Sequence, residues 1–211
     1  MNVIFMVEEQ IHQEFYTKKR WNNWINKVKE ADLKITNEES GKLDDTGLLL
    51  VNMQDDVILA CLKVIAKFER DSISQKEALH ILSQIKDIVL EEIEPISEDI
   101  DMMFDSIQTS LMGALAACEC YITGSYDKDA NIEDLFKAAV ESEEQDDIES
   151  VFRYVAEIGG SVLAGAKLPE SLLENVQYGL AAELMDGIDS ISAAMIGADS
   201  YKEDDGDYDP V

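Results

Sequence analysis

The sequence is poor in basic residues and has no long uncharged stretch. The chain has 17 lysines and arginines and 45 acidic residues, which gives a formal net charge of −28. Such a chain repels nucleic acid phosphates and anionic lipid headgroups, so we expect neither as a partner. The longest uncharged run, residues 106–118, has 13 residues, whereas a membrane span needs about 20. The stretch "VIFMV" (3–7) is too short for a signal peptide and lacks a basic lead, which favours a cytoplasmic location.

Cysteine is scarce, and the three that occur are poorly placed to act together. Cys118 and Cys120 lie two positions apart in a helical pattern, so their side chains point about 200° apart around the axis. They therefore suit neither one disulfide nor one zinc ion. We predict that these two and Cys61 are reduced, buried thiols of a cytosolic protein.

Proline is also rare, with three residues, and β-branched runs are few. Both features argue against a β-sandwich or β-barrel. Apolar residues make up 46% of the chain, which is enough for a real core. Two explanations of the acidity remain open: solubility in a salty cytoplasm, or mimicry of an acidic ligand. We favour the first because the acids are spread along the whole chain.

Apolar residues recur at helical spacing, and capping residues mark where helices begin. Ser74 and Glu77 form a capping box, and Gly124 is placed to end a helix. The small residues of "QTSLMGALAACECYI" (108–122) predict a central helix that neighbours approach closely. The predicted helices cover residues 17–30, 48–69, 74–93, 98–122, 131–141 and 146–163, with one or two more in 169–196 and a polar loop at 31–46.

This pattern predicts an all-α fold, a single helical bundle of about seven helices. We expect one helical domain over residues 14–198, preceded by a flexible extension over residues 1–13. Residues 199–211 carry six acids and one lysine. We expect them to form a disordered acidic tail.

The stretch "FYTKKRWNNWINKVKE" (15–30) holds both tryptophans and five of the 17 basic residues. Trp21 and Trp24 share one helix face with Ile25 and Val28, so we favour both as core anchors. The alternative is that one tryptophan stays exposed beside the basic residues, as at interface hot spots. The predicted partner-contact residues are Tyr16, Lys18, Lys19 and Arg20.

The polar stretch "NMQDD" (52–56) interrupts an apolar helix. Asn52, Asp55 and Asp56 share one side by helical spacing. We favour a stripe that faces solvent. The alternative is a polar seam that holds a partner or fixes the register of the bundle.

Two patterns resemble metal sites. "DKDANIEDLFKA" (127–138) begins like a calcium loop, but Ile132 replaces the turn glycine and Ala138 replaces the closing glutamate. A turn followed by a helix cap explains it better.

The second pattern is Glu-x-x-His, which occurs twice, as Glu9 with His12 and as Glu77 with His80. Di-metal bundles use two such pairs with further glutamates. Acids are so common here that chance pairings are expected, and Glu77 already has a capping role.

No nucleophilic constellation or phosphate-binding glycine loop stands out. We therefore predict a non-enzymatic protein-interaction module, an adaptor or regulator, that binds another protein without a cofactor. Self-association stays open as one form of this binding. The rival prediction is a carboxylate/histidine metal-binding helical-bundle enzyme.

Five segments occur together in a characteristic order: "FYTKKRWNNWINKV", "LLLVNMQDDVILACLKVIAKF", "IKDIVLEE", "QTSLMGALAACECYI" and "YGLAAELMDGIDSISAAM". As a set they resemble the archaeal family catalogued as domain of unknown function 2150, over roughly residues 14–196. The resemblance implies a small acidic cytoplasmic protein of archaea and favours the salt-adaptation explanation. It implies no activity, cofactor or catalytic residue.

Overall fold

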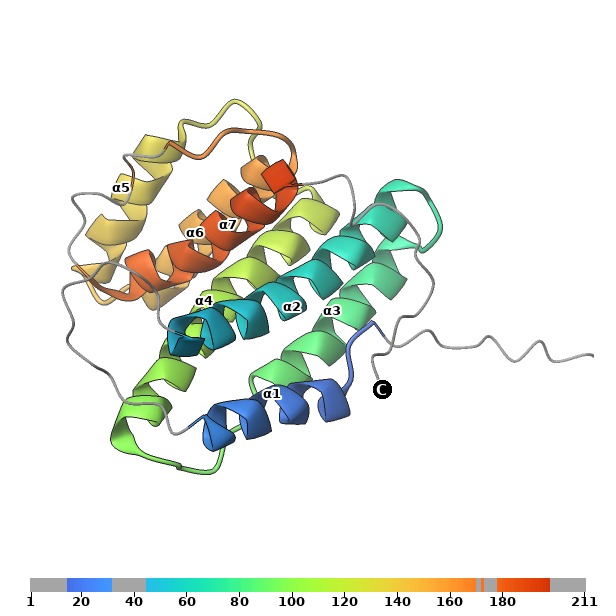
Figure 1. Ribbon diagram of the computed structural model, residues 1–211. Helices are drawn as coiled ribbons and strands as arrows, with labels where there is room; N and C mark the ends of the chain where they lie inside the picture. The colour runs from blue at the N-terminus through green and yellow to red at the C-terminus, as the bar shows by residue number, and fades with distance from the viewer. Residues whose placement is uncertain (1–14, 32–44, 170–171, 173–177, 198–211) are drawn as a thin grey trace, which may run out of the picture.

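The computed structural model describes residues 15–31, 45–169, 172 and 178–197, which contain seven α-helices and no strand (Figure 1). The bounds are α1 Lys18–Glu30, α2 Asp45–Glu69, α3 Gln75–Val89, α4 Glu98–Thr123, α5 Ile132–Glu143, α6 Ile148–Leu163 and α7 Leu180–Gly197. The predicted all-α class and the predicted number of helices are confirmed. The predicted extension over 1–13 and the acidic tail over 199–211 lie outside the described residues.

Local caps start α1, α3, α4 and α5 where the sequence predicts them. The capping box is present, because the Ser74 side chain accepts from the Glu77 amide and the Glu77 side chain accepts from the Ser74 amide. Asn131 accepts from two amides of the first turn of α5. Gly124 ends α4 in the left-handed conformation, with φ of 69°.

Several helix boundaries differ from the prediction. Helix α2 begins at Asp45 rather than at residue 48, and α7 begins at Leu180 within the predicted range 169–196. Helix α3 ends at Val89 rather than at residue 93, because the Gln108 side-chain amide of α4 donates to the carbonyls of Val89 (2.8 Å) and Glu91 (3.0 Å). Helix α6 is capped by Asp147, which accepts from the Ser150 amide at 3.2 Å. Asp146 lies before it with a φ of 57°, outside the helix.

Helix α4 is the centre of the bundle, with α2 and α3 on one side and α5, α6 and α7 on the other (Figure 1). Its small residues permit very close approach, as predicted. A Cβ atom added to Gly113 would lie 2.2 Å from the Leu184 carbonyl oxygen of α7. A Cβ atom added to Gly159 of α6 would lie 2.2 Å from the Cβ of Ala117.

The prediction of buried thiols is confirmed for two of the three cysteines. Cys61 and Cys118 are buried and Cys120 is half-buried. Contact with Cys61, together with burial, raises the pKa of the Cys118 thiol. Burial raises the pKa of the Cys120 thiol to about 11.

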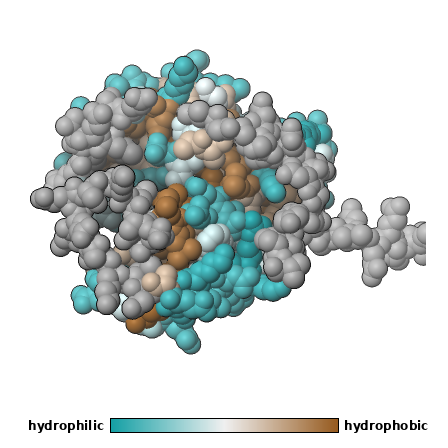
Figure 2. Space-filling view, in the orientation of Figure 1, coloured by the Kyte–Doolittle hydropathy of each residue, from teal (hydrophilic) through white to brown (hydrophobic). Residues whose placement is uncertain are grey.

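Helix α2 exposes three large apolar side chains, and Figure 2 shows apolar surface in the middle of this view beside hydrophilic surface. These side chains are Leu48, Val51 and Leu59, each between 41% and 47% exposed.

Candidate functional site

Helix α1 lies at the edge of the bundle, where it packs against α2 and α3. The buried side chains of α1 are those of Trp21, Ile25 and Val28. Its flanks are polar and differ from each other. One flank is bonded to α2, whereas the other borders a cleft beside the connection from α3 to α4, residues 90–97.

The α2 flank is organised by the Asp56 carboxylate. Arg20 donates to it with two guanidinium nitrogens, through Nε at 2.8 Å and through Nη2. The Trp24 indole Nε1 donates to the same carboxylate at 2.8 Å. The Asp56 side chain is only 14% exposed. Because a bidentate charged pair is strong and directional, Asp56 fixes both the position and the rotation of α1.

Tyr16 completes this flank, two positions before α1 begins at Lys18. Its side chain is 5% exposed, and the Arg20 guanidinium lies 5.4 Å from the centre of its ring. Burial, followed by the nearby Asp56 carboxylate, raises the pKa of Tyr16 above its usual range. The phenol therefore stays neutral, and its hydroxyl makes no hydrogen bond within the described part of the chain.

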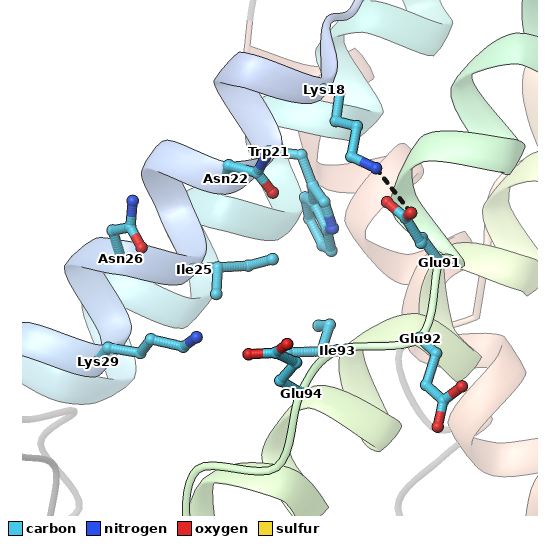
Figure 3. Close-up of a pocket in the computed structure, with 10 residues that line it drawn as sticks. All are labelled: Lys18, Trp21, Asn22, Ile25, Asn26, Lys29, Glu91, Glu92, Ile93 and Glu94. Atoms are coloured by element: carbon cyan, nitrogen blue, oxygen red, sulfur yellow. Dashed lines mark hydrogen bonds and ion pairs between the residues drawn. The ribbon is translucent and has the colours of Figure 1, made fainter.

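The second flank borders a cleft of about 430 Å³ between α1 and residues 91–94 (Figure 3). Trp21 and Ile25 contribute its apolar surface from α1, and Ile93 contributes from the connection. Asn22 and Asn26 bring side-chain amides to the same wall. Pockets of about 300–1,000 Å³ with apolar walls and a few polar groups are typical of ligand sites.

The two walls of the cleft carry opposite charges. Lys18 and Lys29 come from α1, whereas Glu91, Glu92 and Glu94 come from the connection. Lys18 and Glu91 form an ion pair at 2.6 Å that crosses between the walls, as the dashed line in Figure 3 shows. Among the described residues, Lys29, Glu92 and Glu94 form no ion pair.

The Trp21 indole has an unused hydrogen-bond donor. The side chain is 1% exposed, and its Nε1 atom has no hydrogen-bond partner in the described ranges. Figure 3 shows the nitrogen on the edge of the ring that faces the connection, on the side of Glu91. Buried tryptophan N–H groups usually have a partner, so this one calls for an explanation.

The predicted core role of Trp21 is confirmed. Trp24 is half-buried: it packs against the core and keeps one ring face under the Lys27 ammonium, 4.3 Å from the ring centre. Of the four predicted contact residues, Lys18 and Lys19 are exposed. Tyr16 is buried and Arg20 is bonded to Asp56, and the partner contact of all four stays a prediction.

The favoured interpretation of "NMQDD" as a solvent stripe holds for Asn52, which is exposed, but not for the rest. Gln54 donates to the Ser110 hydroxyl of α4 at 2.9 Å and to the Ser190 hydroxyl of α7 at 2.8 Å. Together with Asp56, Gln54 forms a polar seam that links α2 to three other helices. Asp55 is half-buried, and burial raises the pKa of its carboxyl group.

The two metal patterns have different outcomes. In the calcium-like stretch, Asp127 accepts from the Asp129 amide at 3.0 Å and Asn131 caps α5, which confirms the turn and cap. In the second Glu-x-x-His pair, Glu77 is bonded to Ser74 and His80 is exposed. Glu9 and His12 lie outside the described residues, so convergence of the two pairs stays a prediction. Within the described ranges no three histidine, cysteine or acidic side chains are grouped to hold a metal ion.

One polar contact between α5 and α7 was not predicted from the sequence. The Glu143 carboxylate, at the end of α5, accepts from the amides of Leu180 (2.7 Å) and Ala181 (2.9 Å). It caps the first turn of α7 from another helix and complements the positive end of the helix dipole. Glu143 and Leu180 are 37 positions apart in the sequence, so no local signal marks the contact.

Fold and site together define an all-α bundle whose peripheral basic helix flanks a cleft. The chain belongs to the family of uncharacterised proteins conserved in archaea (DUF2150), whose profile matches residues 14–204. No curated protein and no solved structure matches it. In the part of the chain that is described, every helix is too short or too polar to cross a membrane.

Proposed function

We propose that this protein is a non-enzymatic, cytoplasmic protein-interaction module of archaea, an adaptor or regulator that docks a partner protein along α1 and the adjoining cleft. The observation that carries the proposal is the Trp21 indole N–H, which is buried beside the cleft without an acceptor. A partner that enters the cleft supplies this acceptor.

The construction of α1 supports this role. On the flank that faces α2, Asp56 fixes the position of α1. On the opposite flank, side-chain amides and lysines of α1 line the cleft. A docking helix whose geometry is set before binding loses little conformational entropy when the partner arrives. In this proposal, Tyr16 and Arg20 position α1, and Lys18 and Lys19 lie at the edge that the partner meets.

The charge of the chain selects the kind of partner. A net charge of −28 opposes association with nucleic acids and anionic membranes and accelerates encounters with basic surfaces. We therefore propose a partner protein with a basic segment.

Site-specific photo-cross-linking tests the proposal. A photoreactive amino acid replaces Asn26, which is exposed and lines the cleft. The control carries it in place of Lys137, an exposed residue of α5. We expect one cross-linked protein from the Asn26 variant in native extract, identified by mass spectrometry and reproduced with the purified partner. Equal cross-linking from both positions, or none from Asn26, contradicts the proposal.

A further inference from the structure

The cleft also indicates the chemistry of the segment that it binds, an inference that rests on the proposed function. An indole nitrogen donates one hydrogen bond and accepts none. The group that satisfies Trp21 is therefore an oxygen acceptor, and the main-chain carbonyl is the commonest such group in a polypeptide. Asn22 and Asn26, on the same wall, can pair with both main-chain amides and carbonyls.

The Lys18–Glu91 ion pair joins the two walls of the cleft that Trp21 lines. Figure 3 shows the pair crossing from α1 to the connection on the same side of the Trp21 ring as its nitrogen. Both side chains are well exposed, at 59% and 47%. Because exposed ion pairs contribute little to stability, a ligand can separate this one at small cost.

The connection wall selects for positive charge. Glu92 and Glu94 line the cleft and form no ion pair among the described residues, and separating Lys18 from Glu91 frees a third carboxylate. Ile25 and Ile93 leave apolar surface beside these carboxylates for a small aliphatic side chain.

We propose that the cleft binds an extended segment of a partner protein in which basic and small apolar side chains alternate. A main-chain carbonyl of the segment accepts from Trp21 Nε1, a lysine or arginine meets Glu92 and Glu94, and an aliphatic side chain covers Ile25 and Ile93. Binding displaces Lys18 from Glu91. An acidic segment could also reach Lys18 and Trp21, but it would face three glutamates and the negative field of the whole chain.

Nuclear magnetic resonance on the full-length ¹⁵N-labelled protein tests this inference. The probe is a synthetic peptide of alternating lysine and valine, blocked at both ends. Peptides of alternating glutamate and valine, and of lysine and glycine, serve as comparisons. We expect the lysine–valine peptide to move the Trp21 indole proton downfield to saturation, while the indole proton of Trp24, bonded to Asp56 at 2.8 Å, moves much less.

Two variants separate the basic segment from an acidic one. Replacing Glu92→Gln and Glu94→Gln together should weaken binding of the lysine–valine peptide about three- to tenfold, as expected for two exposed charge pairs. The matched control, Asp87→Asn with Asp105→Asn, also removes two exposed acids but none that line the cleft, and should change the affinity less than twofold. Lys18→Ala should strengthen binding of a basic segment because it frees Glu91, whereas it would weaken binding of an acidic one.

The inference is overturned if no peptide moves the Trp21 indole proton, or if a bound water already satisfies that donor and no peptide displaces it. It is also overturned if the glutamate–valine peptide binds best, or if Lys18→Ala weakens the lysine–valine peptide. A partner cross-linked from Asn26 without any peptide response at Trp21 would retain the proposed function and remove only this inference. A response at Trp21 without a cross-linked partner would support the chemistry assigned to the cleft and contradict the proposed docking of a partner protein.

Discussion

The crossing of α4 and α7 predicts a steep penalty for adding one methyl group. The two helices meet through reciprocal glycines. A Cβ atom at Gly113 would lie 2.2 Å from the Leu184 carbonyl oxygen, and one at Gly187 would lie 2.0 Å from the Ser110 carbonyl oxygen. Both obstacles are main-chain atoms of a helix, so no rotamer change removes the clash. The helices must separate, which loosens the packing around both positions.

The magnitude follows from two opposing terms. Overpacking costs about 1–3 kcal/mol, and a main-chain obstacle places Gly113→Ala at about 3 kcal/mol. Replacing a helical glycine by alanine also stabilises the helix by about 1 kcal/mol, because alanine has the higher helix propensity. The net loss of about 2 kcal/mol in the free energy of unfolding lowers Tm by about 4–8 °C in a chain of this size. Because either substitution alone separates the same helices, Gly113→Ala with Gly187→Ala should cost less than the sum of the two.

Urea unfolding followed by circular dichroism measures these changes. Gly160→Ala is the matched control, since the three atoms nearest its added Cβ would be side-chain atoms of Tyr126, each at 3.1 Å, and no main-chain atom would be among them. Its gain in helix propensity offsets the small contact, so its stability should stay within about 1 kcal/mol of wild type. An unchanged midpoint for Gly113→Ala, or equal losses for Gly113→Ala and Gly160→Ala, would refute the close crossing of α4 and α7.

Three further predictions concern α1 and the thiols. Asp56→Asn should destabilise the protein by about 1.5 kcal/mol, because it removes the charge that holds Arg20; urea unfolding measures the loss, and a red shift of tryptophan emission shows that α1 loosens. Because burial raises the pKa of Tyr16 above its ordinary value of 10.0, the folded state favours the neutral phenol. Stability should therefore fall as the pH rises above 10.0, measured as Tm against pH. The Cys120 thiol, with its pKa raised to about 11, should react slowly with iodoacetamide at pH 8, and faster as the pH approaches 11.

Each of these predictions has a control on the same chain. Asp105→Asn removes an exposed acid that lies outside the polar seam and should leave stability and emission unchanged. Tyr16→Phe should flatten the fall in Tm above pH 10, and an equally steep fall in that variant would contradict the assignment to Tyr16. Cys61 and Cys118 should stay unmodified until the protein unfolds, whereas rapid labelling of either in the folded protein would contradict their burial.

The starts of α3 and α5 were predictable from sequence because their causes are local. Ser74 and Asn131 bind amides two or three positions away, so the residues that form the cap stand together in the sequence. The central position of α4 was predictable for a related reason. Small residues permit close approach whatever the identity of the neighbouring helix.

The end of α3 and the polar seam were not predictable because their causes lie far along the chain. Gln108 binds the Val89 carbonyl across 19 positions, and Gln54 reaches Ser190 across 136. From the sequence we favoured a stripe that faces solvent over a polar seam, because exposed polar residues are the rule on surface helices. Only the packing of α4 and α7 against α2 decides between them.

The candidate site was predictable in part. The concentration of aromatic and basic residues at 15–30 marked the segment that forms α1, and helical spacing predicted that Trp21 is buried. The cleft itself was not predictable, because its second wall comes from residues 91–94, about 70 positions from Trp21 in the sequence. That Arg20 and Trp24 share one acceptor depends on Asp56, which the sequence places in another helix.

The most direct test of the account is the Trp21 indole proton in the presence of the partner protein recovered by cross-linking. Two-dimensional ¹H–¹⁵N spectra of the labelled chain resolve two indole signals, one for Trp21 and one for Trp24. If the partner docks in the cleft, the Trp21 proton shifts downfield in proportion to the bound fraction as its unused donor gains an acceptor, while the Trp24 proton keeps its bond to Asp56 and moves little. A Trp21 signal that stays in place at saturating partner would contradict docking at this site.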